Sequence, residues 1–347
     1  MSGKLLITSS PHIRSGDTTR SIMIAVITAL IPAVIFSGFL FGWRAIVITA
    51  ISVASSVLAE YLFNLCCKKK QTIKDCSAIV SGLLLALTLP VAVPVWIPVV
   101  GSFFAMIVVK GVFGGLGNNF MNPALAARAF LFIAWPVHMT TWIKPFEYDG
   151  LSIFLKVNID EIITSATPMQ ALRAEEFHFS ELSELFMGNV GGSIGETSAL
   201  LLLLGGIYLL IRRVINWQIP VFYIGSVAVL SMLFPVQQDV AFQYALAQIC
   251  GGGLMLGAIY MATDYATSPT TSRGRVLYAI GCGVLTVIFR RFSNYPEGVS
   301  FAILLMNTLA WTIDGITKPR RFGKGGAFYG KREEDEKDMA EPAALTD

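Results

Sequence analysis

Three hydroxyl side chains close to a carboxylate form the first group in this sequence that could do chemistry. Residues 160–168 read Asp-Glu-Ile-Ile-Thr-Ser-Ala-Thr-Pro, which places Thr164, Ser165 and Thr167 just before a proline. Taken alone, this segment predicts a turn or a helix start, with Thr167 as the N-cap and Pro168 as the first helical residue. A chemical role for it needs support from elsewhere in the chain.

Two further polar segments interrupt apolar sequence. Residues 114–124 read Gly-Gly-Leu-Gly-Asn-Asn-Phe-Met-Asn-Pro-Ala, and residues 261–269 read Met-Ala-Thr-Asp-Tyr-Ala-Thr-Ser-Pro. Glycine-rich, polar backbone at membrane depth is costly unless it lines a cavity or binds a polar ligand. The second segment also places the carboxylate of Asp264 at a helix end. Both segments therefore predict a polar site inside an otherwise apolar protein.

Four acidic residues lie within or at the ends of apolar segments, where an ionisable group is a functional candidate. They are Glu60, Glu196, Asp264 and Asp314, and Glu60 and Asp264 are the candidates for an ion path. Each also has a structural explanation, which is favoured for each residue taken singly. Glu60 could pair with a neighbouring helix, Glu196 suits the positive end of a helix, and the two aspartates could pair with a nearby Arg or Lys. The three histidines are scattered, so neither a metal site nor a catalytic residue is predicted.

The composition is that of a membrane protein. Hydrophobic residues make up 54% of the chain and charged residues 14%, against roughly 25% charged residues in soluble domains. The mean hydropathy is +0.64. A net charge of +3 gives no indication of nucleic-acid binding. The sequence therefore predicts an all-α polytopic protein whose first partner is the lipid bilayer.

Apolar segments long enough to approach the thickness of a bilayer recur along the chain. A membrane helix needs about 20 residues, and on this basis about ten transmembrane helices are predicted. The third and fifth are short, which indicates broken or tilted helices. The predicted spans are 21–42, 45–66, 77–92, 95–113, 124–138, 195–211, 217–234, 243–262, 275–290 and 299–316.

Lys and Arg predict the orientation, because they accumulate on the cytoplasmic side of a membrane. Most of them fall on one side if both termini are cytoplasmic; Arg44, Arg290 and Arg291 are the exceptions. We therefore expect a multi-pass inner-membrane protein in five parts. These are a cytoplasmic segment 1–20, helices one to five in 21–138, an extracytoplasmic loop 139–194, helices six to ten in 195–316 and a cytoplasmic tail 317–347.

The two halves of the chain share a short pattern. Residues 81–86 read Ser-Gly-Leu-Leu-Leu-Ala in span three, and residues 252–257 read Gly-Gly-Leu-Met-Leu-Gly in span eight. Each segment is followed by a break in the apolar sequence. Five spans per half would give two inverted repeats, which often frame a site near the midplane. A chance likeness between Gly- and Leu-rich helices is the equal alternative.

Taken together, these segments make the chain similar to the RnfD and NqrB flavoprotein subunits of ion-pumping respiratory complexes. The likeness runs over most of the sequence, and the compact length is more similar to RnfD. The matching segments include 10–12, 29–32, 81–90, 114–124, 195–198, 264–269 and 296–299, with Asn307 and Asp314.

The resemblance implies that Thr167 carries FMN through a phosphoester bond, which would make the chain a phosphoprotein and a flavoprotein. The family pattern places an acidic residue, a hydroxyl residue, Gly and Ala before the modified Thr. Glu161, Thr164, Ser165 and Ala166 occupy these positions. Glu161 replaces the usual Asp and Ser165 replaces the Gly. Thr164 is the alternative attachment site.

The resemblance also implies a non-covalent riboflavin, for which Asn118 and Asn122 are the candidate ligands. It implies an electron-transfer subunit of an Rnf-type complex, which links ferredoxin and NAD to Na⁺ or H⁺ transport and is not a complete enzyme alone. The implied partners are subunits of the A, B, C, E and G types and a flavin transferase for maturation. An NqrB-like subunit of a Na⁺-translocating NADH:quinone reductase and a non-redox secondary transporter are the alternatives.

Overall fold

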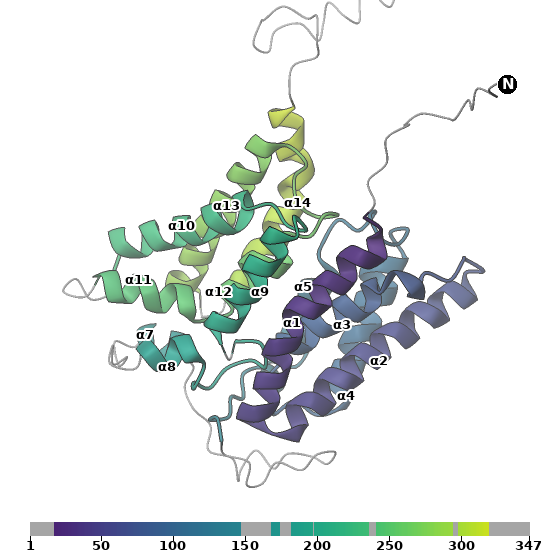
Figure 1. Ribbon diagram of the computed structural model, residues 1–347, viewed down its shortest axis with the longest axis horizontal. Helices are drawn as coiled ribbons and strands as arrows, with labels where there is room; N and C mark the ends of the chain where they lie inside the picture. Colours follow the sequence, from purple (N-terminus) through teal and green to yellow (C-terminus); the bar gives the residue numbers. More distant parts are fainter. Residues whose placement is uncertain are drawn as a thin grey trace, which may run out of the picture.

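The computed structural model describes residues 17–146, 168–173, 182–196, 198–235, 241–293 and 298–318. These residues form helices joined by loops (Figure 1). The N-terminal helices, purple to blue, form one group, and the C-terminal helices, green to yellow, form another. The prediction of an all-α, polytopic protein is confirmed.

Each predicted span coincides with helix in the described part of the chain. The first half holds α1 Thr19–Phe41, α2 Trp43–Cys66, α3 Ser77–Leu87, α4 Trp96–Phe103 with the π-helix η2 Phe104–Gly111, α5 Pro123–Ala134 and the short α6 Pro136–Met139. The second half holds α9 Ala199–Ile211, α10 Gln218–Leu233, α11 Ala241–Cys250, α12 Leu254–Leu256 with the π-helix η6 Gly257–Met261, α13 Ser272–Phe292 and α14 Val299–Thr317.

By length and composition, four of these helices can cross a bilayer: α1, α2, α13 and α14. A fifth span is the bent pair formed by α11 with α12 and η6. The remaining predicted spans are shorter apolar helices, and α3 and α5, with 11 and 12 residues, are short as the sequence predicted.

The structure adds a break inside span eight, which was predicted as one continuous helix over 243–262. The chain bends by 61° between α11 and α12. Gly252 and Gly253 cause the bend, because their φ angles of 63° and 67° lie in the left-handed region, which glycine enters without steric cost. Span eight is thus two half-helices that meet at a glycine turn.

Arg44 lies at the break between α3 and α4, and Arg290 lies at the break between α11 and α12. These positions explain why both residues depart from the rule that Lys and Arg accumulate on the cytoplasmic side. Both are buried, with 2% and 5% of their surface exposed. Arg44 donates from Nε to the carbonyl of Val91 and from Nη2 to that of Val93, each over 2.9 Å. Arg290 donates to the carbonyls of Gln248, Gly251 and Gly252. Backbone carbonyls released by a broken helix need donors inside a membrane, and these two arginines supply them.

The segment just before α9 lies between α3 and α12 and contacts both. The amide of Gly195 donates to the carbonyl of Leu87 over 2.7 Å, and that of Ile194 donates to Leu89 over 3.0 Å. A Cβ atom on Gly195 would lie 2.7 Å from the Leu87 carbonyl oxygen and 3.2 Å from the side chain of Leu256. Only glycine fits between α3 and α12 at this point.

Part of the helix packing is repeated in the two halves. In the first half α2 packs on α3 and α4, and in the second α10 packs on α11 and α13. Across the halves α1 packs on α9 and α5 packs on α14. This order supports a repeat of five helices, and the inverted direction of the halves stays a prediction.

In the described residues, the long loop 139–194 contains two short helices. They are α7 Pro168–Arg173 and α8 Leu182–Met187. Met169, Leu172 and Leu185 form an apolar cluster with Tyr244 and Ala247 of α11. This part of the loop is therefore packed against the helices.

Candidate functional site

Two of the three polar segments meet at one pocket of about 850 Å³. The pocket lies between α1, the glycine loop after η2, the loop after η6, and α14. Its aromatic walls are Phe120, Tyr265 and Trp311. Its polar lining includes Asp264, Thr267, Ser268, Thr270, Asn307, Thr308 and Asp314. We call this space the interhelical pocket.

The glycine loop can line the pocket because of its backbone conformation. Gly114, Gly115 and Gly117 have φ angles of 111°, 97° and 94°, a region that side chains with a Cβ atom rarely adopt. No atom lies within 4 Å of a Cβ built on Gly115 or Gly117. Backbone conformation, and not crowding, therefore requires glycine at these two positions.

A smaller cavity of about 60 Å³ adjoins the interhelical pocket. The two share Met23, Leu116 and Asp264. The small cavity is also lined by Ser77, Ser81, Lys110, Asn119 and Asn122. A polar space of this size has room for water, so it extends the pocket towards Lys110.

The three asparagines of the glycine loop have different positions. Asn118 is exposed and lines neither cavity. Asn122 is buried and caps α5, because its Oδ1 accepts from the amides of Ala124 and Leu125. Asn119 is also buried, and its Nδ2 donates to Met121 over 3.1 Å.

Among the described residues, neither Oδ1 of Asn119 nor Nδ2 of Asn307 has a hydrogen-bond partner. Both residues are 4% exposed, and buried polar groups are rarely left unpaired. Asn119 was not predicted as a site residue, although the polar segment contains it. Asn307 was identified from the sequence only as a position that matches the family.

Asp264 and Asp314 bind hydroxyl and amide groups. Asp314 accepts from the backbone amide and hydroxyl of Thr270 and of Thr271, over 3.0–3.3 Å. Asp264 accepts from the hydroxyl of Thr267 over 3.2 Å. Burial raises the pKa of Asp264 above its ordinary value, and hydrogen bonds from the Ala266 amide and Thr267 offset part of the shift. This carboxyl group lies where the two cavities meet.

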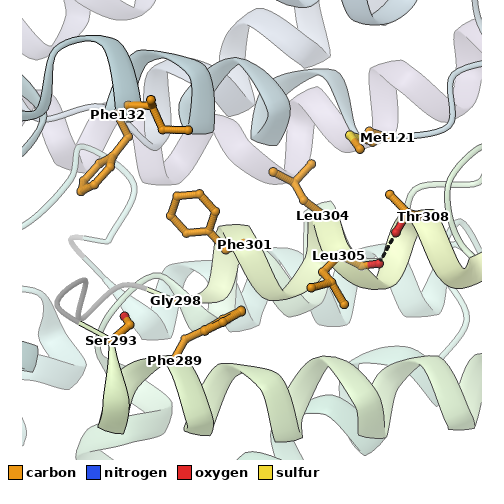
Figure 2. Close-up of a pocket in the computed structure, with 10 residues that line it drawn as sticks. Met121, Phe132, Phe289, Ser293, Gly298, Phe301, Leu304, Leu305 and Thr308 are labelled. Atoms are coloured by element: carbon orange, nitrogen blue, oxygen red, sulfur yellow. Dashed lines mark hydrogen bonds between the residues drawn. The ribbon is translucent and has the colours of Figure 1, made fainter.

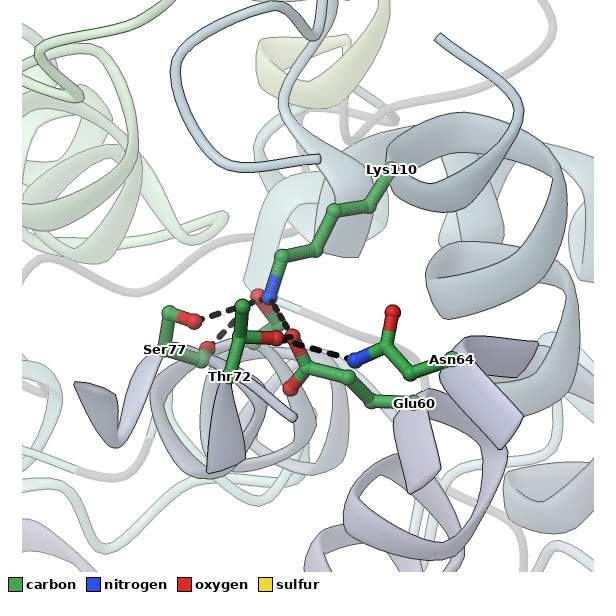
Figure 3. A network of polar contacts seen from close by, with 6 residues as sticks. Glu60, Asn64, Thr72, Ser77 and Lys110 are labelled. Atoms are coloured by element: carbon green, nitrogen blue, oxygen red, sulfur yellow. Dashed lines mark hydrogen bonds and ion pairs between the residues drawn. The ribbon is translucent and has the colours of Figure 1, made fainter. Parts of the chain in front are cut away.

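Glu60 is paired with a lysine on a neighbouring helix, which confirms its structural explanation. Figure 3 shows Lys110 of η2 pointing to Glu60 of α2, with Nζ 2.7 Å from Oε1 and 2.8 Å from Oγ of Ser77. Thr72 donates to the same Oε1 atom over 2.7 Å and accepts from Asn64 over 3.0 Å. The ion pair is buried, with 7% of the Glu60 side chain and 5% of the Lys110 side chain exposed.

The ion pair belongs to a continuous polar path. Thr72 is exposed at one end, and Lys110 lines the small cavity at the other. Asp264 lies between that cavity and the interhelical pocket. The two predicted ion-path candidates are thus connected through Lys110.

Glu196 lies apart from this path. Its carboxylate is beside Gly253, where a Cβ atom would be 2.8 Å from Oε1. That oxygen is buried and has no hydrogen-bond partner in the part of the chain that the structure describes. Ser198 caps α9 by accepting from the amide of Leu201 over 3.3 Å, so Glu196 precedes the helix that it was expected to open.

Glu161, Thr164, Ser165, Ala166 and Thr167 lie outside the described residues. Helix α7 begins at the next residue, Pro168. The side chain of Met169 lies over the glycine turn, 2.7–2.8 Å from Cβ atoms built on Gly251 and Gly252. The helix that follows the predicted attachment residue is therefore fixed at the break in span eight.

Comparison with known proteins gives one family and several close relatives. The model of the NQR2, RnfD, RnfE family matches residues 6–323. The D subunit of the Na⁺-translocating ferredoxin:NAD⁺ oxidoreductase complex of Acetobacterium woodii is 46% identical, covering 92% of this chain and 95% of that protein. The D subunit of the proton-translocating ferredoxin:NAD⁺ oxidoreductase complex of Clostridium ljungdahlii is 40% identical, covering 91% and 96%. The D subunit of the ion-translocating oxidoreductase complex of Stutzerimonas stutzeri is 40% identical, covering 87% and 92%.

Proposed function

The chain belongs to the NQR2, RnfD, RnfE family, and from this premise we propose that it is the D-type, flavin-carrying membrane subunit of an Rnf-type complex. It passes electrons between ferredoxin and NAD while the complex moves Na⁺ or H⁺. The observation that carries this proposal is similarity over nine-tenths of the chain to the D subunits of such complexes. Ferredoxin and NAD bind to partner subunits of the A, B, C, E and G types, so the chain alone is not a complete enzyme.

The proposal includes both Na⁺ and H⁺ as coupling ions, because the relatives are named for different ions. The protein from Acetobacterium woodii is named for Na⁺ and that from Clostridium ljungdahlii for protons. The NQR2-type alternative has less support, since the relatives at 40–46% identity are all D subunits. A non-redox transporter would carry no flavin, so the flavin content of the purified protein separates that alternative from the proposal.

FMN is bound to Thr167 through a phosphoester. The support is the Glu161–Thr167 pattern together with the position of α7, which begins at Pro168 and packs over the glycine turn. When bound, the flavin exchanges one or two electrons, while the protein positions it and sets its potential. The separate transferase that attaches it works outside the cytoplasm, in agreement with the N-in, C-in orientation proposed from Lys and Arg.

Riboflavin binds non-covalently in the interhelical pocket. The pocket offers about 850 Å³, aromatic walls, and a polar edge, and ligand sites are commonly of 300–1,000 Å³ with a few placed polar groups. Nδ2 of Asn307, in the lining of the pocket, can donate to a carbonyl or ribityl oxygen of a flavin. Oδ1 of Asn119 lines the adjoining small cavity and can accept from a donor of the flavin that reaches into that cavity. Both atoms are buried and unpaired, so a polar ligand would satisfy them.

Replacing Asn119 by alanine is expected to reduce bound riboflavin without affecting covalent FMN. An unpaired buried polar group costs about 1–3 kcal/mol, so the lost contact should weaken binding about tenfold or more. Riboflavin in an acid extract, measured per covalent flavin, is the readout. Asn118→Ala is the matched control, because this neighbour is exposed and lines neither cavity. Full riboflavin content in the Asn119 variant would reject a riboflavin that reaches from the pocket into the small cavity.

The polar path from Thr72 through Glu60 and Lys110 to Asp264 is the proposed ion route. Its support is continuity: each group bonds to the next or lines the same cavity. An ion-path carboxylate inside a membrane is expected to be paired when no ion is bound. Lys110 provides this pairing for Glu60.

A further inference from the structure

A second cavity lies on the side of the protein, between α5, α13 and α14. Its volume is about 560 Å³. In Figure 2, Phe132 faces Phe301 from one side, and Phe289 and Ser293 lie on the opposite side near Gly298, while Met121 and Thr308 lie at the other end. Among the described lining residues, Ser293 and Thr308 contribute the hydroxyl groups. The lining suits a hydrocarbon and gives water few partners. We call this space the lateral groove.

The groove opens on surface that faces lipid. Ile133 and Leu305 line it, and they are 73% and 43% exposed. Helices α13 and α14, which form two of its sides, are long and apolar enough to cross a bilayer. An exposed apolar groove on such helices is accessible to lipid chains.

The length of the groove matches one leaflet. It runs along α14 from Gly298, just before the helix begins, to Thr308. Ten residues of helix rise about 15 Å, which is half of the roughly 30 Å hydrocarbon core. The groove therefore spans from the membrane surface to near the midplane, as an acyl chain of one leaflet does.

One arginine lies at the surface end of the groove. Arg173 of α7 is exposed and donates to the carbonyl of Ser293, which lines the groove. A guanidinium has five N–H donors, so one bond to a carbonyl leaves donors for a phosphate. Arg291 of α13 points away from the groove, because it lies on the helix face opposite Phe289 and Ser293 and donates to the carbonyl of Phe234 over 2.8 Å.

We propose that the lateral groove binds one acyl chain of an anionic phospholipid whose phosphate is held by Arg173. The site is separate from the proposed flavin pocket except for Thr308, which lines both. The apolar groove selects a chain, and Arg173 selects a negative head group.

The test is native mass spectrometry of the full chain in detergent, offered phosphatidylglycerol or phosphatidylcholine. We expect one tightly retained phosphatidylglycerol on the unmodified chain. Leu305→Trp fills the groove and should reduce retention several-fold. Leu309→Trp is the matched control, since Leu309 lies on the same helix, is 42% exposed and does not line the groove. Arg173→Gln should lower the preference for phosphatidylglycerol roughly tenfold, as expected for lost charged hydrogen bonds.

Three outcomes with the isolated chain would overturn the proposal. They are no retained lipid on the unmodified chain, equal retention by the Leu305 and Leu309 variants, and equal retention of both lipids. The same measurement on the whole complex identifies the rival occupant. A lipid present on the isolated chain and absent from the complex would mean that a partner helix covers the groove, and it would also overturn the proposal. None of these readouts depends on flavin.

Discussion

Thr167→Ala is expected to remove covalent flavin fluorescence from the denatured polypeptide completely. The proposed bond joins the flavin phosphate to the Thr167 hydroxyl, and alanine has no oxygen to form an ester. The measurement is in-gel fluorescence of the purified chain, supported by the intact mass, which should fall by one FMN residue as well as by the change in side chain. Since the bond is covalent, the expected effect is all or nothing.

Two neighbouring variants are the controls for this result. Thr164→Ala should keep full fluorescence, and Ser165→Gly should be modified at least as completely as the unmodified chain. Glycine restores the family pattern at this position and reaches positive φ angles without cost. If fluorescence survives Thr167→Ala and disappears in Thr164→Ala, the attachment site is Thr164. An unmodified chain without fluorescence would reject the covalent flavin.

Lys110→Met is expected to destabilise the protein by about 3–5 kcal/mol, the cost of leaving one member of a buried ion pair alone. Glu60 would lose the ammonium that is 2.7 Å from its carboxylate. Glu60→Gln should also destabilise the protein. The double variant E60Q/K110M should lose much less free energy of unfolding than the two single variants lose together. A double-mutant cycle measured by thermal unfolding in detergent gives the coupling directly.

Lys74→Met is the control for this cycle because Lys74 is exposed, and surface substitutions usually change stability by less than about 0.5 kcal/mol. If Lys110→Met costs no more than Lys74→Met, the ion pair does not stabilise the fold. The double variant also tests the proposed ion route. Undiminished ion transport by a complex that contains it would exclude Glu60 from the route.

The helices of this protein follow directly from its sequence, because apolar segments of near-membrane length are separated by charged loops. The break at Gly251–Gly253 does not follow in the same way. Glycine is common in membrane helices, so three glycines alone do not distinguish a bend from a packing contact. The bend depends on Arg290, about 40 residues later, which binds the released carbonyls.

The candidate site could be predicted only as segments. The sequence indicated two polar segments, and the structure shows that they share one pocket. Whether Asn118 or Asn119 lines the small cavity beside that pocket depends on the positive φ angles of the glycine loop, which cannot be derived from residue spacing. The pairing of Glu60 with Lys110 joins residues 50 positions apart, and no local pattern shows it. The prediction of orientation from Lys and Arg likewise uses only the position of each residue in the sequence. It cannot show that Arg44 binds carbonyls inside the protein.

The contact between Gly195 and α3 has a consequence for the synthesis of the chain. The carbonyls of Leu87 and Leu89 receive their donors from Gly195 and Ile194, which are made roughly 100 residues later. At a translation rate of about 5–20 residues per second, these donors emerge roughly 5–20 s after α3 has been made. During that interval the carbonyls of Leu87 and Leu89 lack these donors in the bilayer. The newly made N-terminal half should therefore stay beside the insertion machinery, or be held by a chaperone, until the first residues of the second half arrive.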